Sequence, residues 1–407
     1  MTMPSFNDYS ISSYGGMVID ERRTRPYVEA LKRAVKPCAV VLDIGTGTGL
    51  FAFIAAQLGA ARIHAVEPDD AIEIARLCAA NNVNADRIQW VQGLSTEIDL
   101  PEQADVVIGD LHGTMPFYKH NVESLKDART RHLKPGGVLL PCRDRLYVAP
   151  ASAEMEYDSL RRPWQENDYG VDFSAARRWI ANSWWKVKGA AVKEDDLLGA
   201  PINWGSIDYL AAESSTLRGS AEWTIERSAT MHGYYVWFDT ELGDGLQITN
   251  TPLLPSIAYG RAFFPLESEI ALEPGDKVQV KLAAVAMDDA HIYRWDTRIA
   301  TAGGSPKASF RQSTFNSRPL ARHARMAAAD HVPELGEAGL IDLAILQGMA
   351  ASQPLGAIAE TMLVQFPGKF PSKHAALNRA ARVSGLYNRD LASRRQSRAE
   401  SDTQTPT

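Results

Sequence analysis

The sequence predicts an α/β domain with a parallel sheet, followed by an antiparallel β domain and a small helical module. Three observations predict this order. From residue 38 to 144, short apolar runs alternate with helical segments, which is typical of a parallel sheet covered by helices on both faces. Between residues 145 and 301 the apolar runs alternate with polar residues and are separated by turn residues, as in antiparallel sheets. Residues 320–390 have mostly helical periodicity.

The composition is that of a globular chain of more than one domain. The 407 residues are 45% hydrophobic and 23% charged, and this length exceeds one ordinary core. The net charge of -6 gives no general attraction to nucleic acid or to anionic membranes, so we expect neither as a partner. No apolar run approaches the ~18 residues of a membrane span, and the first residues lack a signal-peptide pattern. We therefore expect a cytoplasmic protein, and the three scattered cysteines predict no metal site.

The first element expected is a helix over 18–36, within an N-terminal helical cap of residues 1–37. Four apolar residues recur there at helical spacing: Val18, Tyr27, Leu31 and Val35. The α/β domain is expected over residues 38–144. Its five strands are predicted at the runs AVVLDIG, RIHAVEP, RIQWVQG, ADVVIGD and GVLLP.

The antiparallel domain is expected over residues 145–301. Its clearest strands are HGYYVWFDTEL, GRAFFPLESEIAL and DKVQVKLAAVAM, and the sequence EPGDK predicts a hairpin turn. An arm at about 159–190, rich in Trp and Arg, has an amphipathic helical pattern. Exposed apolar segments of this kind usually pack on a partner, so we expect a homodimer. Residues 302–319 are expected to be a linker.

The helical module of residues 320–390 has a short resemblance to a known fold. The run ILQGMAASQPLGAIAETMLVQFPGKF is similar to the winged-helix fold of PqqD-like peptide-recognition domains. That resemblance implies docking of a peptide or partner, while plain packing against the β domain is the alternative. The helix pattern IAETMLVQF contains no base, so DNA binding is not expected. Residues 391–407 cannot bury apolar surface and are expected to be disordered.

A glycine loop follows the first predicted strand, at Gly45, Gly47 and Gly49. Glycines let the backbone turn tightly and approach a ligand closely. Asp43 precedes the loop, where it can meet the ammonium, or a water, beside the methionine part of S-adenosylmethionine (SAM). Glu67 ends the second strand, where it can accept both ribose hydroxyls, whereas NAD folds space their glycines as G-x-G-x-x-G. These residues predict SAM as cofactor; a tight strand–helix turn with a surface acid is the alternative.

The adenine of the cofactor is expected after the third strand. Ser95 and Thr96 stand there, with hydroxyls that can hydrogen-bond the adenine edge. The alternative is an ordinary polar loop.

Four segments together resemble the protein arginine methyltransferase family, over roughly residues 8–300. They are DERRTRPY, VLDIGTGTGLFAFIAAQLGA, LLPCRDRLYVAPA and WQENDYGVDFS. The resemblance implies a class I SAM methyltransferase (Rossmann-like) domain, followed by a β-barrel that carries a helical dimerisation arm. It also implies that Arg23 grips the SAM carboxylate, a contact suited to a guanidinium fork.

The chain departs from this family where the family clamps its arginine substrate. The family uses two glutamates there, but this chain has Asp110 in the first place and Lys119 in the second. A desolvated guanidinium that meets a lysine in place of a carboxylate loses several kcal/mol. The family's Thr-His-Trp loop corresponds to the sequence PSIAYG, which has no histidine. The resemblance therefore implies the scaffold without implying an ordinary arginine acceptor.

Three residues are the candidates for catalysis. Asp110 and His112 lie on the loop after the fourth strand, and imidazole titrates in the range needed of a general base. Lys119 can grip a carboxylate or phosphate of the acceptor, and Tyr118 and Tyr259 can wall the pocket. The alternatives are a loop histidine satisfied by solvent or backbone and a solvated surface lysine.

The residues thus predict methyl transfer to a nitrogen or oxygen nucleophile of a small metabolite or peptide. Two other hypotheses stay open. One is a divergent protein arginine methyltransferase, and the other is a SAM-binding scaffold without catalysis. The sequence alone does not identify the acceptor or the general base.

Overall fold

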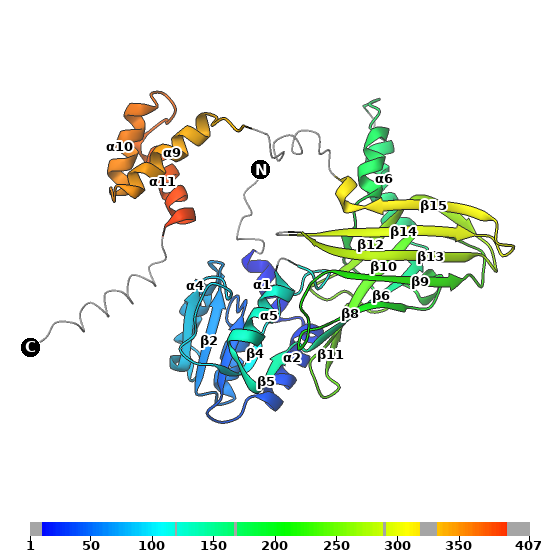
Figure 1. Ribbon diagram of the computed structural model, residues 1–407, viewed down its shortest axis with the longest axis horizontal. Coiled ribbons are helices and arrows are strands. Elements are labelled where there is room, and N and C mark those ends of the chain that lie inside the picture. The colour runs from blue at the N-terminus through cyan, green and yellow to red at the C-terminus, as the bar shows by residue number, and fades with distance from the viewer. Residues whose placement is uncertain (1–9, 119, 167–168, 288–289, 318–331, 389–407) are drawn as a thin grey trace, which may run out of the picture. The chain divides into compact units, whose positions relative to one another are not determined.

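A computed structural model of the chain describes residues 10–118, 120–166, 169–287, 290–317 and 332–388. The chain divides into two compact units, residues 1–319 and 320–407. Figure 1 labels their elements.

Two helices begin the described chain, α1 (Ile11–Val18) and α2 (Glu21–Ala34). One continuous helix was expected over 18–36. The break occurs at Asp20, whose side chain accepts a hydrogen bond from the backbone N–H of Arg23 at 3.3 Å and so caps α2. The cap places Arg23 in the first turn of α2, where it is buried.

The parallel sheet is confirmed, with five strands in the order β3-β2-β1-β4-β5. The strands are β1 (Val40–Ile44), β2 (Arg62–Glu67), β3 (Ile88–Gln92), β4 (Ala104–Ile108) and β5 (Leu133–Leu140). The connecting helices are α3 (Leu50–Gln57), α4 (Ala71–Ala79), the short η1 (Ala85–Arg87) and α5 (Asn121–Arg131). The strand order reverses between β1 and β4, and open α/β sheets bind ligands beyond the carboxyl ends of the strands at such a point.

Two antiparallel sheets follow, as expected for the β-barrel domain (Figure 1). The first has the order β7-β12-β10-β6-β8 with β11 on β10, and the second has the order β15-β14-β13-β9. The first sheet contains β6 (Arg143–Ala151), β7 (Trp185–Val187), β8 (Ile202–Asp208), β10 (Ala229–Glu241), β11 (Gln247–Thr249) and β12 (Arg261–Leu272). The second contains β9 (Leu217–Thr224), β13 (Lys277–Met287), β14 (Ala290–Ala300) and β15 (Pro306–Ser313). One apolar cluster extends from the parallel sheet through both.

Two expectations for this domain are corrected. The sequence EPGDK does not close a hairpin, because β12 and β13, which it joins, belong to different sheets. The segment 302–319, expected to be a linker, contains β15, which pairs with β14, and the short η4 (Thr314–Ser317). The alternating pattern of β15 is weak because most of its residues are exposed or half-buried, which hid the strand.

The arm contains two helices, α6 (Glu154–Gln165) and α7 (Arg177–Ala181), with the short η2 (Ser174–Ala176) before α7. A further single turn, η3 (Glu194–Asp196), follows β7. Figure 1 shows α6 projecting beyond the sheets. Large apolar side chains are exposed on and after α6, namely Met155, Trp164, Tyr169 and Phe173. The arm was expected at about 159–190, whereas its helices begin earlier, at Glu154, and end earlier, at Ala181.

The second unit contains α9 (Glu337–Ala350), α10 (Leu355–Gln365) and α11 (Lys373–Tyr387). These helices have their own small core, with Ile345, Ile358, Met362, Ala380 and Val383. Residues 332–388 contain no strand, so the described part of the module lacks the wing of a winged helix. The segment between α10 and α11 carries two prolines, which cannot donate to a β-ladder. The tail expected to be disordered lies outside the described residues.

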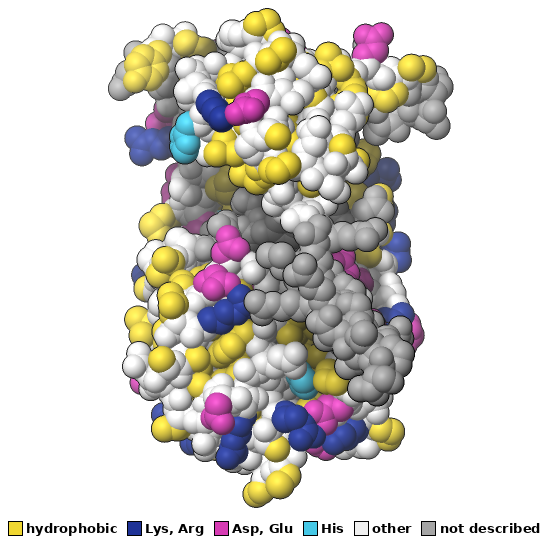
Figure 2. All heavy atoms as spheres, turned by 90° about the vertical axis from the view of Figure 1, so that its left-hand side faces the viewer, with side chains coloured by type: hydrophobic (Ala, Val, Ile, Leu, Met, Phe, Trp, Pro, Cys, Tyr) yellow, Lys and Arg dark blue, Asp and Glu magenta, His cyan; other side chains and the backbone are white. Residues whose placement is uncertain are grey.

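No helix in the described residues is long and apolar enough to cross a membrane. On the face drawn in Figure 2, basic and acidic side chains lie in small mixed groups, with no field of one sign. The cytoplasmic location stays a prediction.

Candidate functional site

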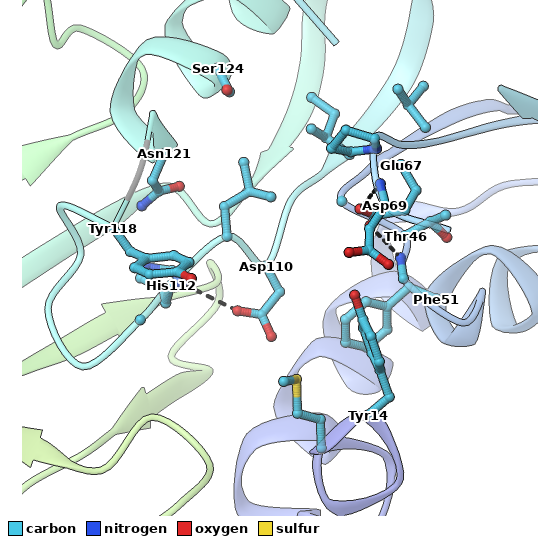
Figure 3. Close-up of a pocket in the computed structure, with 18 of the residues that line it drawn as sticks. Tyr14, Thr46, Phe51, Glu67, Asp69, Asp110, His112, Tyr118, Asn121 and Ser124 are labelled. Atoms are coloured by element: carbon cyan, nitrogen blue, oxygen red, sulfur yellow. Dashed lines mark hydrogen bonds and ion pairs between the residues drawn. The ribbon is translucent and has the colours of Figure 1, made fainter. Parts of the chain in front are cut away.

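A large cavity lies at the carboxyl edge of the parallel sheet (Figure 3). Its volume is about 1470 Å³, including the open mouth. It is lined by the β1–α3 loop, the segments after β2, β3 and β4, the helix α1, and the loop before β12. Because this volume includes solvent at the mouth, it is an upper bound on the space for a ligand.

The glycine loop forms one wall of this cavity, through Gly45 and Gly47. Gly47 has φ +55°, and a Cβ there would lie 2.8 Å from a ring carbon of Tyr14 on α1. Its backbone N–H donates to Glu67 at 2.8 Å. Glycine is therefore required at this position, both for the backbone conformation and for the close approach of α1.

Asp43 and Gly49 lie beneath the cavity and do not line it, which differs from their expected roles. The Asp43 carboxylate is buried and accepts a hydrogen bond from the Thr46 hydroxyl at 2.6 Å. Burial raises its pKa to about 7, against the Thr46 hydrogen bond, which lowers it. Asp43 thus supports the loop from below. A Cβ on Gly49 would lie within 3.0 Å of Trp90, Phe53 and Ala75, so this glycine serves helix–sheet packing.

Glu67 lines the cavity at the end of β2, as expected of a ribose ligand. One carboxylate oxygen accepts the N–H of Gly47, and the other accepts the backbone N–H of Asp69 at 3.0 Å. In Figure 3, Glu67, Asp69 and Thr46 lie together on one side of the cavity. The ribose role of Glu67 stays a prediction.

Of the two residues expected near adenine, the structure places one at the cavity. Ser95 is buried and lines it, whereas Thr96 is exposed outside it.

Arg23 and Asp110 form a buried ion pair in the cavity wall. Arg23 also donates to the carbonyl of Met17 at 3.1 Å, and its Nε is buried with no hydrogen-bond partner among the described residues. Burial opposes the Arg23 charge, but the Asp110 and Tyr259 oxygens raise its pKa above the usual value. Arg23 therefore stays charged and retains a donor for an anionic ligand.

Asp110 lies between Tyr118 and His112 on one side of the cavity and Thr46, Glu67 and Asp69 on the other (Figure 3). One of its oxygens meets Arg23, and the other accepts from the hydroxyl of Tyr259 and from His112 Nδ1, the latter at 3.3 Å. Burial opposes its ionisation, but Arg23 and the hydrogen bonds from His112 and Tyr259 lower its pKa to about 2. Asp110 is thus held as an anion, with Oδ1 accepting two hydrogen bonds and Oδ2 in the ion pair with Arg23 but without a hydrogen bond from a described residue.

His112 is not placed as a free base. Its imidazole is fully buried, and its Nε2 lies 3.0 Å from the Asp144 carboxylate while Nδ1 faces Asp110. Burial disfavours the charge, but Asp144 and Asp110 raise the pKa of His112 to about 9. An imidazolium cannot accept a proton, so the general-base expectation is corrected.

Lys119, the third catalytic candidate, lies outside the described residues. Tyr118 and Tyr259 line the cavity, as expected.

The sequence reasoning missed two residues. Lys186 on β7 lines the cavity mouth and donates to the carbonyl of Ala258 at 3.3 Å, and Asp144 on β6 holds His112. Only the unusual Arg-Asp-Arg run at 143–145 could have drawn attention to Asp144.

Comparison with known proteins agrees with this geometry. The family model described as "Ribosomal protein L11 methyltransferase (PrmA)" matches residues 22–140. "Protein arginine N-methyltransferase 6" of Xenopus tropicalis is 28% identical over 287 residues, 67% of this chain and 84% of the relative. "Probable protein arginine N-methyltransferase 6" of Arabidopsis thaliana is 30% identical over 246 residues, and this match spans 58% of this chain and 56% of the relative.

Solved structures share the fold. Protein arginine methyltransferase 10 of Arabidopsis thaliana, in an open conformation, has a TM-score of 0.64 at 24% identity and covers 75% of this chain and 97% of its own. The PRMT1 enzyme-prozyme heterotetramer of Trypanosoma brucei, with AdoHcy, has a TM-score of 0.67 at 22% identity and covers 76% and 98%. The α/β and antiparallel domains therefore have the arrangement of these enzymes.

Proposed function

We propose that this chain, which is a protein arginine methyltransferase-like class I SAM-dependent methyltransferase, does not use an ordinary arginine as its acceptor. Its acceptor is a nitrogen or oxygen nucleophile of a small metabolite or of a peptide. With SAM bound, the nucleophile would form a bond to the methyl carbon, the carbon–sulfur bond would break with its electron pair left on the sulfur of S-adenosylhomocysteine (SAH), and the proton of the nucleophile would pass to water.

The cavity residues fit SAM. Arg23 offers a buried Nε donor without a partner for the cofactor carboxylate. Gly47 lines the cavity with Tyr14 packed against its backbone, and Glu67 stands at the strand end where the ribose is expected. When bound, SAM supplies an electrophilic methyl group, so the protein mainly has to align the nucleophile and exclude water.

The observation that carries the proposal is the engagement of Asp110. An arginine clamp needs carboxylate oxygens with free acceptor capacity that face the guanidinium. Of the described cavity acids, Glu67 and Asp69 lie on the glycine-loop side, and Asp110 is already held by Arg23, His112 and Tyr259. A second positive group brought to Asp110 would compete with Arg23.

Lys186 supports an acceptor that carries an anionic group. It lines the mouth of the cavity, forms no ion pair with a described residue, and packs its stem on Gly260. Burial and the nearby Lys188 lower its pKa, and an anionic partner would offset both effects. A cation at this place repels a guanidinium and attracts a carboxylate.

The alternative is a divergent arginine methyltransferase, and the names of the sequence relatives favour it. In that case the guanidinium of the substrate replaces Arg23 as the ion-pair partner of Asp110, and other groups of the substrate compensate for the missing second glutamate.

Labelled SAM distinguishes these functions. We expect SAH to bind the purified chain in calorimetry, and we expect no label on an arginine-rich peptide. Label on that peptide that is lost in Asp110→Asn but kept in Lys119→Ala would establish the arginine enzyme instead. Asp99→Asn is the matched control, because its side chain is 99% exposed. Absence of SAH binding would contradict both enzymatic functions.

We also propose that the arm mediates a homodimer. The exposed Met155, Trp164, Tyr169 and Phe173 support this proposal. Sedimentation of the full chain and of Trp164→Asp tests it, because a dimer held by the arm is expected to dissociate in the variant.

A further inference from the structure

A buried set of four charges connects the barrel domain to Arg23. Asp110 and Asp144 supply two carboxylates, and Arg23 and the protonated His112 supply two cations. His112 lies between the carboxylates, 3.3 Å from Asp110 and 3.0 Å from Asp144. All four side chains are at least nine-tenths buried, so solvent does not screen their charges from one another.

Asp144 is fixed from three sides. Its Oδ1 accepts from the Thr240 hydroxyl at 2.6 Å, and its Oδ2 accepts from the Tyr209 hydroxyl as well as from His112. Tyr209 in turn accepts from Asn121 Nδ2 at 3.0 Å. These partners come from β10, from the end of β8 and from α5, so the carboxylate cannot rotate without breaking contacts in each.

His112 is fixed as well. Its ring stacks on Phe238 of β10, with 5.1 Å between centroids and 18° between planes. Thr240 Oγ1 lies 3.5 Å from Nε2. The imidazole therefore has one orientation, and this orientation aims its second N–H at Asp110.

We infer that the Asp144–His112 pair is a positioning device that holds Asp110, and through it Arg23, in the orientation that binds the cofactor carboxylate. The inference rests on the cofactor assignment in the proposed function. His112 and Asp144 touch no reacting atom and act through Asp110.

The role is distinct from simple support of the fold because it has a charge requirement. Around His112, the charged and titratable groups are Asp110, Asp144 and Tyr259, whose ring centroid lies 5.7 Å from that of the imidazole, with Arg23 and Tyr209 one contact further. If His112 loses its proton, its remaining N–H can serve only one carboxylate. Asp110 then loses the hydrogen bond from His112, and the position of Arg23 is no longer fixed through Asp110.

The test measures SAH affinity by calorimetry on the full chain, together with the melting temperature. The variants are His112→Gln, Asp144→Asn and the double variant, which removes both charges. Each single variant leaves an unbalanced buried charge, whereas the double variant does not. We expect the double variant to melt higher than either single variant, and still to bind SAH at least tenfold more weakly than the wild-type chain.

His232→Gln is the matched control. His232 is also buried, and it accepts from the backbone N–H of Ala153 in the barrel domain, away from the cavity lining. We expect this variant to lose stability without a change in SAH affinity. A double variant that binds SAH as tightly as the wild-type chain contradicts the inference, as does an equal loss of affinity in His232→Gln.

A pH series provides a second readout, which begins with the wild-type chain. SAH affinity of the wild-type chain is expected to fall as pH rises through about 9, the pKa of His112. The fall is expected to be absent in the double variant, and its persistence there would overturn the inference. Failure of the wild-type chain to bind SAH at pH 8 would instead contradict the proposed function.

Discussion

Among single residues, Arg23 combines a structural contact with an unused donor. Its guanidinium pairs with Asp110, donates to the Met17 carbonyl and leaves Nε without a partner. The rings of Phe51 and Tyr259 lie 5.8 and 6.0 Å from its central carbon. Such a guanidinium is held in place before a ligand arrives, which reduces the ordering cost of binding.

Replacement of Arg23 by alanine is therefore expected to weaken SAH binding by about 10- to 100-fold, since a hydrogen bond to a charged group contributes ~1.5–3 kcal/mol. Calorimetry measures the effect. Arg25→Ala, an exposed arginine of the same helix, is the control and is expected to leave the affinity unchanged. Equal affinities of the two variants would exclude Arg23 as a cofactor ligand.

The charge of His112 predicts a pH dependence of stability. Its pKa in the folded chain is about 9, above the ordinary 6.5, so its contribution is complete below pH 6.5 and is lost as pH rises through 9. The shift corresponds to about 3 kcal/mol. Urea unfolding between pH 6 and 10 is expected to show this decline in the wild-type chain, and a flat profile would contradict it.

Sequence reasoning reached some of these residues and not others. Arg23, Gly47 and Glu67 belong to contiguous motifs, and the structure places all three at the cavity. Asp144 lies 32 positions from His112, and the contact pairs a residue of the loop after β4 with one on β6 of the first antiparallel sheet. No local pattern encodes such a contact, so the sequence predicts His112 as a general base and not as a residue that connects two buried carboxylates.

At the scale of elements, the strand ends determine the site. The strands β1, β2 and β4 all end at the same edge of the parallel sheet, and each is followed by cavity residues. These strands were predictable because buried parallel strands are continuous apolar runs. The boundary between α1 and α2 could not be predicted, because Asp20 caps α2 within a stretch whose apolar residues continue at helical spacing.

Gly49 gives a test of packing between these elements. Gly49→Ala places a Cβ within 3.0 Å of Trp90, Phe53 and Ala75, at φ +88°. Gly59→Ala is the matched control, because it has φ +93° and nothing within 4 Å. Both variants suffer backbone strain, and Gly49→Ala is expected to lose about 1–3 kcal/mol more in urea unfolding because of overpacking. Equal losses would show that crowding at Gly49 is relieved without cost.

At the scale of the whole molecule, the chain is built from two units with separate cores. Every described residue that lines the cavity belongs to the unit 1–319, and the helices of the second unit pack around Ile345 and Ile358. The order of domains could be predicted from the change in hydrophobic periodicity along the chain. The fold of the second unit could not be predicted, because a short helical motif is shared by several helical folds.

Truncation after Pro319 is therefore expected to leave SAH affinity within about twofold of the full chain, since no described contact of the cavity is removed. Calorimetry on the two proteins measures this. A tenfold loss would mean that residues beyond 319 contribute to the cofactor site.

The central claim is a SAM-dependent methyltransferase whose acceptor is not an ordinary arginine. The most direct measurement is the chemical identity of the methylated product. The full chain is incubated with labelled SAM and a cell extract, the labelled protein and small-molecule fractions are hydrolysed in acid, and the products are separated beside methylarginine standards. We predict label that elutes apart from monomethylarginine and the dimethylarginines, and label that co-elutes with them would contradict the claim.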